Sequence, residues 1–428
     1  RETIPWVINE STVRKVAING MSRTHACFHM ILSDHHKDHC MENMVSLDPS
    51  APLLFAISGN SEEDLRCRLE KAMDINPYVL VKYTRDMHSG SDISEHAKVC
   101  ESVYNTKDSY RAAITTTAVH KNTEIQRLLS KLSSVISSGR TYKSISGSIF
   151  EPNPVSSSKI AFVYGDTTTP YYDYGKDIFR VFPNQHDVMS KMCPDSWISC
   201  GGIVKNRALY DTEHASYIST HNENVMDKLQ TGIYYSTITA NILMNEINIR
   251  PDSYMGLSLG EICGLFAHSQ QNLDVAICAI EKLNGSDTFS KNIGNDFRVL
   301  RKLWDVNDTV RPNEFFQTYG LIHDSDVVSN VVSNLGDTAG VFQTIISDDT
   351  NSVVCGKPDE CLKFFTEHRM KYIPTTSTIF AHTKTIDCER ESLHDIHSDL
   401  TFPSLVVYSS NVNASHPNPN GGGIAAEH

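Results

Sequence analysis

A serine between two glycines is the clearest chemical signal in the sequence. Residues 256–260 read GLSLG and follow the short apolar stretch Tyr254-Met255. Where a strand turns sharply into a helix, this pattern holds a serine in a strained conformation with its hydroxyl exposed. The first N–H groups of the following helix can face a developing oxyanion. The motif therefore predicts Ser258 as a nucleophile, and the alternative is a glycine-rich turn with a capping serine.

A serine hydroxyl is a weak nucleophile until a base takes its proton, and imidazole is suited to this near neutral pH. His382 is the candidate base, in the stretch Phe380-Ala381-His382-Thr383. Taken alone, one of 19 histidines is more simply explained as an ordinary loop residue. Residues 163–168, VYGDTT, form a polar turn after an apolar run, and its backbone N–H groups could supply a second oxyanion donor.

The elements around these residues predict a parallel α/β sheet. Residues 160–164 form a continuous apolar run, which is typical of a buried parallel strand. Helices are expected over about 174–182 and 225–247, a strand at 254–256, and a helix directly after Ser258. This alternation of strands and helices indicates parallel pairing.

Residues 314–375 have a different succession of expected strands and helices, which predicts the order βαββαβ of a ferredoxin-like unit. Strands are expected at 315–322, 341–346, 353–355 and 371–374, and helices at 324–335 and 358–368. Apolar segments return at 377–381 and 405–408, so this unit is expected to be an insertion in the larger sheet domain.

The first third of the chain is predicted to be a small α+β domain. Residues 13–32 indicate two short strands around a turn, and 53–57 indicate another. Ser61 is expected to cap a helix that buries Leu65 and Leu69. A β-rich run at 109–119 and an amphipathic helix at 122–136 follow, and the Ser-, Gly- and Pro-rich residues 144–158 are predicted to be a linker.

Composition narrows the function classes. A chain of 428 residues favours two or three domains, and a net charge of −13 without a basic run argues against nucleic acid as a partner. No apolar stretch approaches the roughly 18 residues of a membrane span, and residues 1–9 lack the apolar core of a signal peptide. Eleven scattered cysteines without C-x-x-C spacing favour reduced thiols in a cytoplasmic protein and no metal site.

In this order, the motifs resemble the malonyl/acyl-CoA:acyl carrier protein transacylase family over about residues 158–410. Residues 162–178 can be laid without a gap on that family's F-x-F/Y-P-G-Q-G-S-Q segment, and GLSLGE corresponds to its G-H-S-x-G-E motif. Residues 380–383, FAHT, correspond to its A-F-H-S motif. The stretches at 283–304 and at 382–386 with 393–403 look like the acyltransferase of polyunsaturated fatty acid synthases, in a bacterial subunit and its protist counterparts.

The resemblance implies a fold and site roles. The expected fold is α/β, with a hydrolase-like parallel sheet core, the inserted ferredoxin-like (βαββαβ) subdomain, and a preceding small α+β linker domain. Ser258 and His382 are implied as the catalytic pair, and the backbone N–H groups of Leu259 and Thr167 as the oxyanion hole. Thr167 stands where the family has Gln, a change that a backbone donor tolerates.

Three further positions are implied to bind substrate, and each departs from the family. Leu257 stands in place of a His and Ala381 in place of a Phe. The arginine that grips a malonyl carboxylate in the family aligns with Asn284, although Arg298 or Arg301 fills the role in a shifted alignment. Asparagine offers neutral hydrogen bonds rather than a bidentate ion pair, which predicts weaker selection for malonyl and favours an uncharged acyl chain.

The N-terminal part resembles the neighbouring regions of such synthases. Residues 13–34 look like the end of a ketosynthase domain in which the motif glycines are replaced, and residues 51–65 resemble the linker between ketosynthase and acyltransferase. The expected domains are a degenerate ketosynthase tail (1–48), a linker domain (49–157) and an acyltransferase domain (158–428) that contains the inserted subdomain (314–375).

The implied function is acyl transfer from an acyl-CoA or acyl-carrier thioester, through a Ser258 acyl-enzyme, to an acyl carrier protein in polyunsaturated or other fatty acid biosynthesis. Coenzyme A or 4'-phosphopantetheine thioesters are the expected substrates, with no permanently bound cofactor, and other synthase subunits are expected partners. Two alternatives stay open. One is a serine thioesterase or hydrolase, although the chain lacks an acid partner in the order of an α/β-hydrolase. The other is a non-catalytic docking module.

Overall fold

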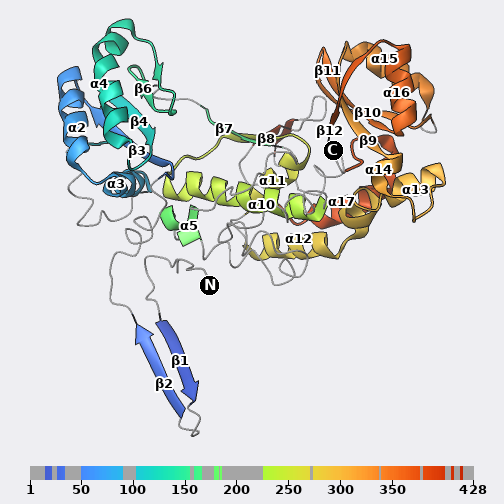
Figure 1. Ribbon diagram of the computed structural model, residues 1–428, viewed down its shortest axis with the longest axis horizontal. Coiled ribbons are helices and arrows are strands. Elements are labelled where there is room, and N and C mark those ends of the chain that lie inside the picture. The colour runs from blue at the N-terminus through green and yellow to red at the C-terminus, as the bar shows by residue number, and fades with distance from the viewer. Residues whose placement is uncertain are drawn as a thin grey trace. The chain divides into compact units, whose positions relative to one another are not determined.

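The structure is a computed structural model (Figure 1), and it describes residues 15–21, 27–33, 50–89, 103–154, 159–165, 178–182, 184–185, 225–269, 273–336, 339–375, 379–400, 406–408 and 415–417. Contacts divide the chain into two compact units. Unit 1 comprises Arg1–Ile160, Gly175–Lys191 and Ile238–Asp252, and unit 2 comprises Ala161–Tyr174, Met192–Thr237 and Ser253–His428. The first break falls near residue 158, where the sequence predicts a domain boundary, but two later segments group with unit 1.

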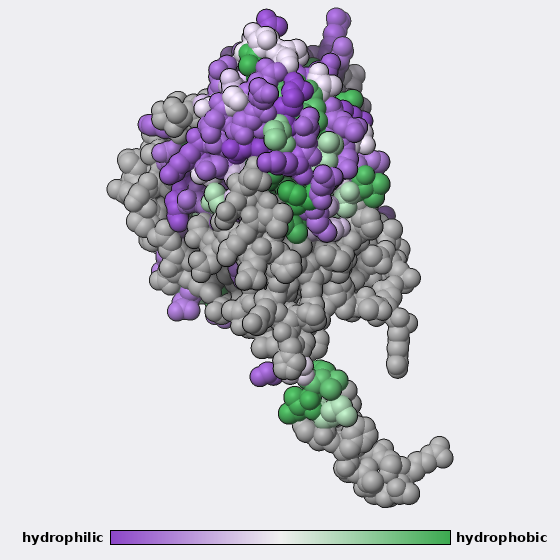
Figure 2. Space-filling model, turned by 90° about the vertical axis from the view of Figure 1, so that its left-hand side faces the viewer, coloured by the Kyte–Doolittle hydropathy of each residue, from purple (hydrophilic) through white to green (hydrophobic). Residues whose placement is uncertain are grey.

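Strands β1 (Lys15–Met21) and β2 (Cys27–Ser33) form an antiparallel hairpin, as expected for residues 13–32. Val16 pairs with Leu32, and both side chains are exposed together with Met30 and Ile31. Figure 2 shows their hydrophobic surface in green. A lone two-stranded hairpin is at best marginally stable in water, so this one needs a further surface to cover it.

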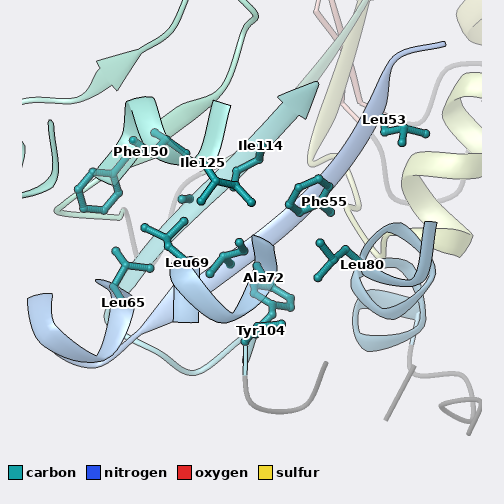
Figure 3. Close-up of a cluster of buried hydrophobic side chains, with 14 of the residues drawn as sticks. Leu53, Phe55, Leu65, Leu69, Ala72, Leu80, Tyr104, Ile114, Ile125 and Phe150 are labelled. Carbon is teal, nitrogen blue, oxygen red and sulfur yellow. The ribbon is translucent and has the colours of Figure 1, made fainter. Parts of the chain in front are cut away.

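A four-stranded antiparallel sheet forms the centre of unit 1, in the order β3-β4-β6-β5. Its strands are β3 (Leu53–Gly59), β4 (Tyr110–Thr116), β5 (Tyr142–Lys143) and β6 (Ile149–Glu151). The helices of this unit are α2 (Glu62–Asp74), α3 (Pro77–Ser89), α4 (Lys121–Ser138) and α5 (Ile178–Val181). Ser61 caps α2 as predicted, because its side chain accepts from the Asp64 N–H. Leu65 and Leu69 are buried with Phe55, Ile114 and Phe150 in the core (Figure 3).

The predicted linker at 144–158 is wrong in its first half. Strand β6 lies within it and pairs with β4, and the Phe150 side chain is fully buried. The Ser144 N–H donates to the Ser148 carbonyl at 2.8 Å, and Gly147 has a φ of 93°. The serines and the glycine therefore build a tight turn that returns the chain to the sheet.

Unit 2 contains a second sheet, in the order β14-β13-β8-β7. Strands β7 (Ala161–Tyr164), β8 (Ser253–Gly256) and β13 (Val406–Tyr408) are parallel, and β14 (Ser415–Pro417) is antiparallel to β13. Strand β13, which follows residues 314–375 in the chain, pairs with β8 in this sheet. The prediction that the run 160–164 is buried throughout is wrong, because Tyr164 is buried but Val163 is 70% exposed.

Helices of unit 2 follow these strands in sequence. Residues 225–247 form α10 (Val225–Asn241), which continues as a π-helix, η3 (Ile242–Glu246); the two elements cross from unit 2 into unit 1. Helix α11 (Leu259–His268) begins directly after Ser258. Then come α12 (Leu273–Gly285), the π-helix η5 (Thr288–Asn292), α13 (Arg298–Trp304), α14 (Pro312–Phe315), the 3-10 helix η7 (Lys384–Glu389) and α17 (Arg390–His397).

The third sheet is antiparallel, with the order β10-β11-β9-β12. Along the chain its elements are β9 (Gln317–Ile322), α15 (Ser325–Leu335), β10 (Val341–Asp348), β11 (Asn351–Gly356), α16 (Pro358–Glu367) and β12 (Lys371–Thr375). This is the expected order of strands and helices. Asp324 caps α15 by accepting from the Val327 N–H at 3.0 Å. Within the described ranges, no helix has the length and apolar composition needed to cross a bilayer.

Candidate active site

The turn between β8 and α11 is a strained elbow. Ser258 has φ 54° and ψ −119°, a conformation that residues with a side chain rarely adopt. A β-carbon added to Gly256 would lie 2.2 Å from the Glu261 nitrogen, and one added to Gly260 would lie 2.3 Å from the Tyr164 carbonyl oxygen. Both glycines of the motif are therefore required by close backbone packing, which is the reason the sequence pattern predicts this turn.

An aromatic cluster joins the two strands and the helix next to this turn. The Tyr164 hydroxyl of β7 lies 2.9 Å from Nε2 of His268, and that imidazole stacks on the Tyr254 ring of β8 with centroids 4.9 Å apart. Burial lowers the pKa of His268 to about 4, so its ring is neutral near pH 7. His268 joins α11 to both strands. Sequence reasoning missed this residue, and its only local signal is its position at the end of α11.

The structure brings the two principal candidates together. The Oγ atom of Ser258 lies 2.9 Å from Nε2 of His382, although the residues are 124 positions apart in the chain. Both side chains are half-buried. When Nε2 carries no proton, it can accept the serine hydroxyl proton, which is the geometry that a general base requires.

The segment before His382 is fixed by one buried ring and by backbone pairing. Phe380 is fully buried in a cluster with Phe316 and Phe342, and its N–H donates to the Ile293 carbonyl at 2.8 Å. Ile379 forms an antiparallel bridge with Gly294. His382 itself has a positive φ of 62°. The base is thus held in a strained conformation close to a firmly packed anchor.

Of the two expected oxyanion donors, the structure describes one. Leu259 is the first residue of α11, and within the described part of the chain its backbone N–H has no recorded acceptor. Such a free N–H at a helix start is available to an anion. The neighbouring Leu257 N–H already donates to the Tyr164 carbonyl at 3.2 Å. Thr167 lies outside the described residues.

The expected substrate-binding residues lie on both sides of the pair. The Leu257 side chain, next to the serine, is 43% exposed, and Ala381, next to the base, is half-buried. Asn284 lies near the end of α12, where its Oδ1 accepts from Nε2 of the buried Gln230 at 2.9 Å. The Asn284 Nδ2 atom is buried and has no acceptor among the residues that the structure describes.

Arg298 and Arg301, the two arginines that a shifted alignment offers for carboxylate binding, both have other partners. The Arg301 guanidinium donates to the carbonyls of Asp296, Asn307 and Val310 at 2.6–2.7 Å, and it lies 4.7 Å from the centre of the Phe315 ring. Arg301 therefore organises the local backbone. Arg298 is exposed and pairs with Asp287 at 3.2 Å.

Comparisons with known proteins agree on the fold. No family model matches the chain. The chain is 24% identical over 416 residues to a subunit of the polyunsaturated fatty acid synthase of Thraustochytrium sp.. The match covers 94% of the chain but only about a fifth (20%) of that relative's length.

Solved structures with the same fold are acyltransferase domains of polyketide synthases. The acyltransferase domain of ZmaA superposes with a TM-score of 0.58 at 13% identity, covering 89% of this chain and 77% of that one. The acyltransferase domain of the iterative polyketide synthase in enediyne biosynthesis gives a TM-score of 0.52 at 12% identity, covering 88% and 79%. The chain therefore has the α/β fold of these acyltransferase domains.

Proposed function

We propose that this chain is the linker-plus-acyltransferase part of a fatty-acid or polyketide-type synthase and that Ser258 carries the acyl group. The observation that carries the proposal is the 2.9 Å approach of Ser258 Oγ to His382 Nε2 at a strained strand-to-helix turn. Similarity to a polyunsaturated fatty acid synthase subunit supports this setting. Coenzyme A or pantetheine thioesters are the proposed donors, and an acyl carrier protein of the synthase is the proposed acceptor.

The proposed reaction proceeds in two halves. His382 Nε2 takes the proton of Ser258 while Oγ attacks the thioester carbonyl, and the Leu259 N–H, with that of Thr167, stabilises the oxyanion. The carbon–sulfur bond then breaks, and His382 returns the proton to the departing thiolate. In the second half, His382 deprotonates a pantetheine thiol, which attacks the acyl-serine and regenerates the hydroxyl. Water in place of the thiol would make the same site a thioesterase.

The domain organisation follows from the same proposal. Residues 158–428 form the acyltransferase domain, and the antiparallel sheet β9–β12 with its two helices is its inserted ferredoxin-like subdomain. Residues 49–157 form the linker domain, and the hairpin within residues 1–48 is the remnant of a ketosynthase end. The exposed apolar side chains of the β1–β2 hairpin support the last assignment, because they require a covering surface.

We further propose that the site prefers uncharged acyl groups over malonyl. Arg301 is occupied by three backbone carbonyls and Arg298 by Asp287. Asn284 is neutral: its Oδ1 is paired with Gln230, and its buried Nδ2 could give a carboxylate only uncharged hydrogen bonds. The exposed Leu257 beside the serine adds an apolar surface. Among these three described candidates a malonyl carboxylate would find no cationic partner, and it would lose its hydration without that compensation.

The test is intact-mass spectrometry after incubation with acetyl-, hexanoyl-, palmitoyl- and malonyl-CoA. Wild type is expected to gain a mass adduct from the uncharged donors, while Ser258→Ala gains none and His382→Ala gains it far more slowly. A preference for malonyl would refute the selectivity proposal alone. Rapid hydrolysis of the adduct with no transfer to carrier protein would favour the thioesterase, and no adduct from any donor would favour the docking module. Asn284→Arg should raise the malonyl-to-acetyl ratio, whereas Asn284→Leu should not.

A further inference from the structure

The segment that carries His382 is attached at both ends to one short stretch of chain, residues 286–294. Before the histidine, Ile379 and Phe380 pair with the backbone of Gly294 and Ile293. After it, the 3-10 helix η7 ends at Glu389, whose side chain reaches the π-helix η5 in the same stretch. His382 therefore lies in a loop whose two ends both bind to residues 286–294.

The second attachment is a carboxylate held by neutral donors. Oε2 of Glu389 accepts from the Thr288 hydroxyl at 2.8 Å, and Oε1 accepts from Nδ2 of Asn292 at 2.9 Å. Within the described residues, Glu389 forms no ion pair. Both oxygens are thus used to join η7 to η5, across about 100 positions of sequence.

Two serine hydroxyls complete this contact. Thr288 is 1% exposed, and its single hydroxyl proton is donated to Glu389, so its oxygen must accept from its other neighbours. Ser392 lies 2.7 Å away and Ser286 lies 3.0 Å away, and both can donate to it. The Thr288 hydroxyl thus donates to the carboxylate and accepts from the serines, an arrangement that suits a negative charge at Glu389.

The conformation of His382 explains why such an attachment matters. A residue with φ of 62° persists only where its surroundings fix it. Ile386 packs against the cluster around Phe380, and its N–H donates to the Thr383 carbonyl at 3.2 Å, but within the described residues the buried hydroxyls of Thr383 and Thr385 have no hydrogen-bond partner. The polar side chains of the turn that follows His382 therefore add nothing to holding it in place. If the downstream attachment is lost, the turn can relax, and a shift of about 1 Å at a reacting group can slow a reaction about 100-fold.

We infer that Glu389, held by Thr288 and Asn292, is a positioning residue that keeps the His382 imidazole at Ser258. The inference rests on the proposed function of that pair. It assigns the π-helix η5 and the carboxylate to the catalytic apparatus, although neither touches the reacting atoms.

The test compares variants of the full chain in two assays: the rate of Ser258 modification by a fluorophosphonate and the kinetics of acylation by the best acyl-CoA donor. Glu389→Ala is expected to lower both the modification rate and the kcat of acylation about 10-fold or more, with KM unchanged. Glu389→Gln should restore only part of the rate, because its amide oxygen can still accept from Asn292 but its NH2 group must donate to Thr288, whose hydroxyl then has to turn away. Lys282→Ala is the matched control. It removes the exposed ion pair between α12 and Asp399, two residues beyond the end of α17, and should leave both rates unchanged.

A double variant separates positioning from general damage. In a His382→Ala background, Glu389→Ala is expected to cost less than 2-fold, because a residue that acts through the base has nothing left to position. If Glu389→Ala fails to fold, Thr288→Val removes the Thr288 bond to Glu389, together with the bonds to Ser286 and Ser392, with little change in side-chain shape, and should lower the rate several-fold. An unchanged rate, or the same loss with and without His382, would overturn the inference. If wild-type Ser258 reacts with neither reagent, the proposed function fails first and the inference with it.

Discussion

A β-carbon on Gly260 would meet the carbonyl oxygen of Tyr164 at 2.3 Å, so the start of α11 lies directly on the end of β7. The same β-carbon would lie 2.7 Å from the Gly165 carbonyl oxygen. Two rigid backbone oxygens therefore limit this position, and no flexible side chain can move aside. The elbow that presents Ser258 depends on this contact.

Gly260→Ala is expected to damage both stability and the site. Overpacking a close contact costs about 1–3 kcal/mol, and relief would require α11 to shift away from β7. Urea unfolding should show the loss of stability, and fluorophosphonate modification of Ser258 should slow at temperatures where the variant is folded. Gly285→Ala is the matched control, because no atom lies within 4 Å of its added β-carbon. Equal stability of the two variants would contradict the packing argument.

Ser258→Gly is expected to be more stable than Ser258→Ala by about 1 kcal/mol. Glycine adopts positive φ without the strain that a side chain brings, and both variants lack the hydroxyl, so the comparison isolates the backbone. Thermal unfolding of the two proteins measures the difference. An alanine variant as stable as the glycine variant would show that the φ of 54° at this residue carries no strain.

His268 should make stability depend on pH. Its pKa in the folded protein, about 4, lies below the ordinary value of 6.5, so the unfolded chain binds the proton first as the pH falls. This contribution to the free energy of unfolding is complete above about pH 6.5 and is lost between pH 6.5 and 4, by at most about 1.4 kcal/mol per pH unit.

The corresponding variant is His268→Gln, which keeps a hydrogen-bonding group for Tyr164. At pH 7.5 the variant is expected to be less stable than wild type, and by pH 4.5 the difference should narrow by about 1–3 kcal/mol. Urea unfolding at a series of pH values gives both curves. A difference that stays constant with pH would show that His268 titrates normally in the folded protein.

Arg301→Lys is expected to affect stability rather than selectivity. Lysine cannot reach three carbonyls in a fixed fork, and it loses the planar contact with Phe315, so a loss of about 2–4 kcal/mol is expected. The ratio of malonyl to acetyl adducts should not change. A selective loss of the malonyl adduct would instead make Arg301 the carboxylate-binding residue.

Much of the local structure around the site follows from short sequence patterns. The glycines at 256 and 260 predict the elbow because no other residue fits beside a crossing backbone. Ser61 and Asp324 predict helix starts because each side chain satisfies a free N–H of the first turn. The element order of residues 314–375 follows from short apolar segments separated by helix caps and polar turns. Each of these signals acts over a few residues.

Other features depend on contacts between distant residues, which no local pattern encodes. Thr288 and Glu389 are ordinary polar residues until the fold places them 2.8 Å apart. The positive φ of His382 has no sequence signal, because only a small fraction of histidines adopt this conformation. Composition alone suggests a linker around Phe150, yet that ring fills the core of unit 1. The apolar run 160–164 likewise does not indicate that Val163, on one of its faces, is exposed to solvent.

The separation of 124 positions between Ser258 and His382 has a consequence for synthesis on the ribosome. At roughly 5–20 residues per second, the serine is translated about 6–25 seconds before its base exists. All four strands of the β10-β11-β9-β12 sheet are synthesised in that interval. Under the proposed mechanism, Ser258 of a nascent chain lacks the imidazole that would activate it during this interval. Acylation would begin only when the segment around residue 382 has emerged and can fold back.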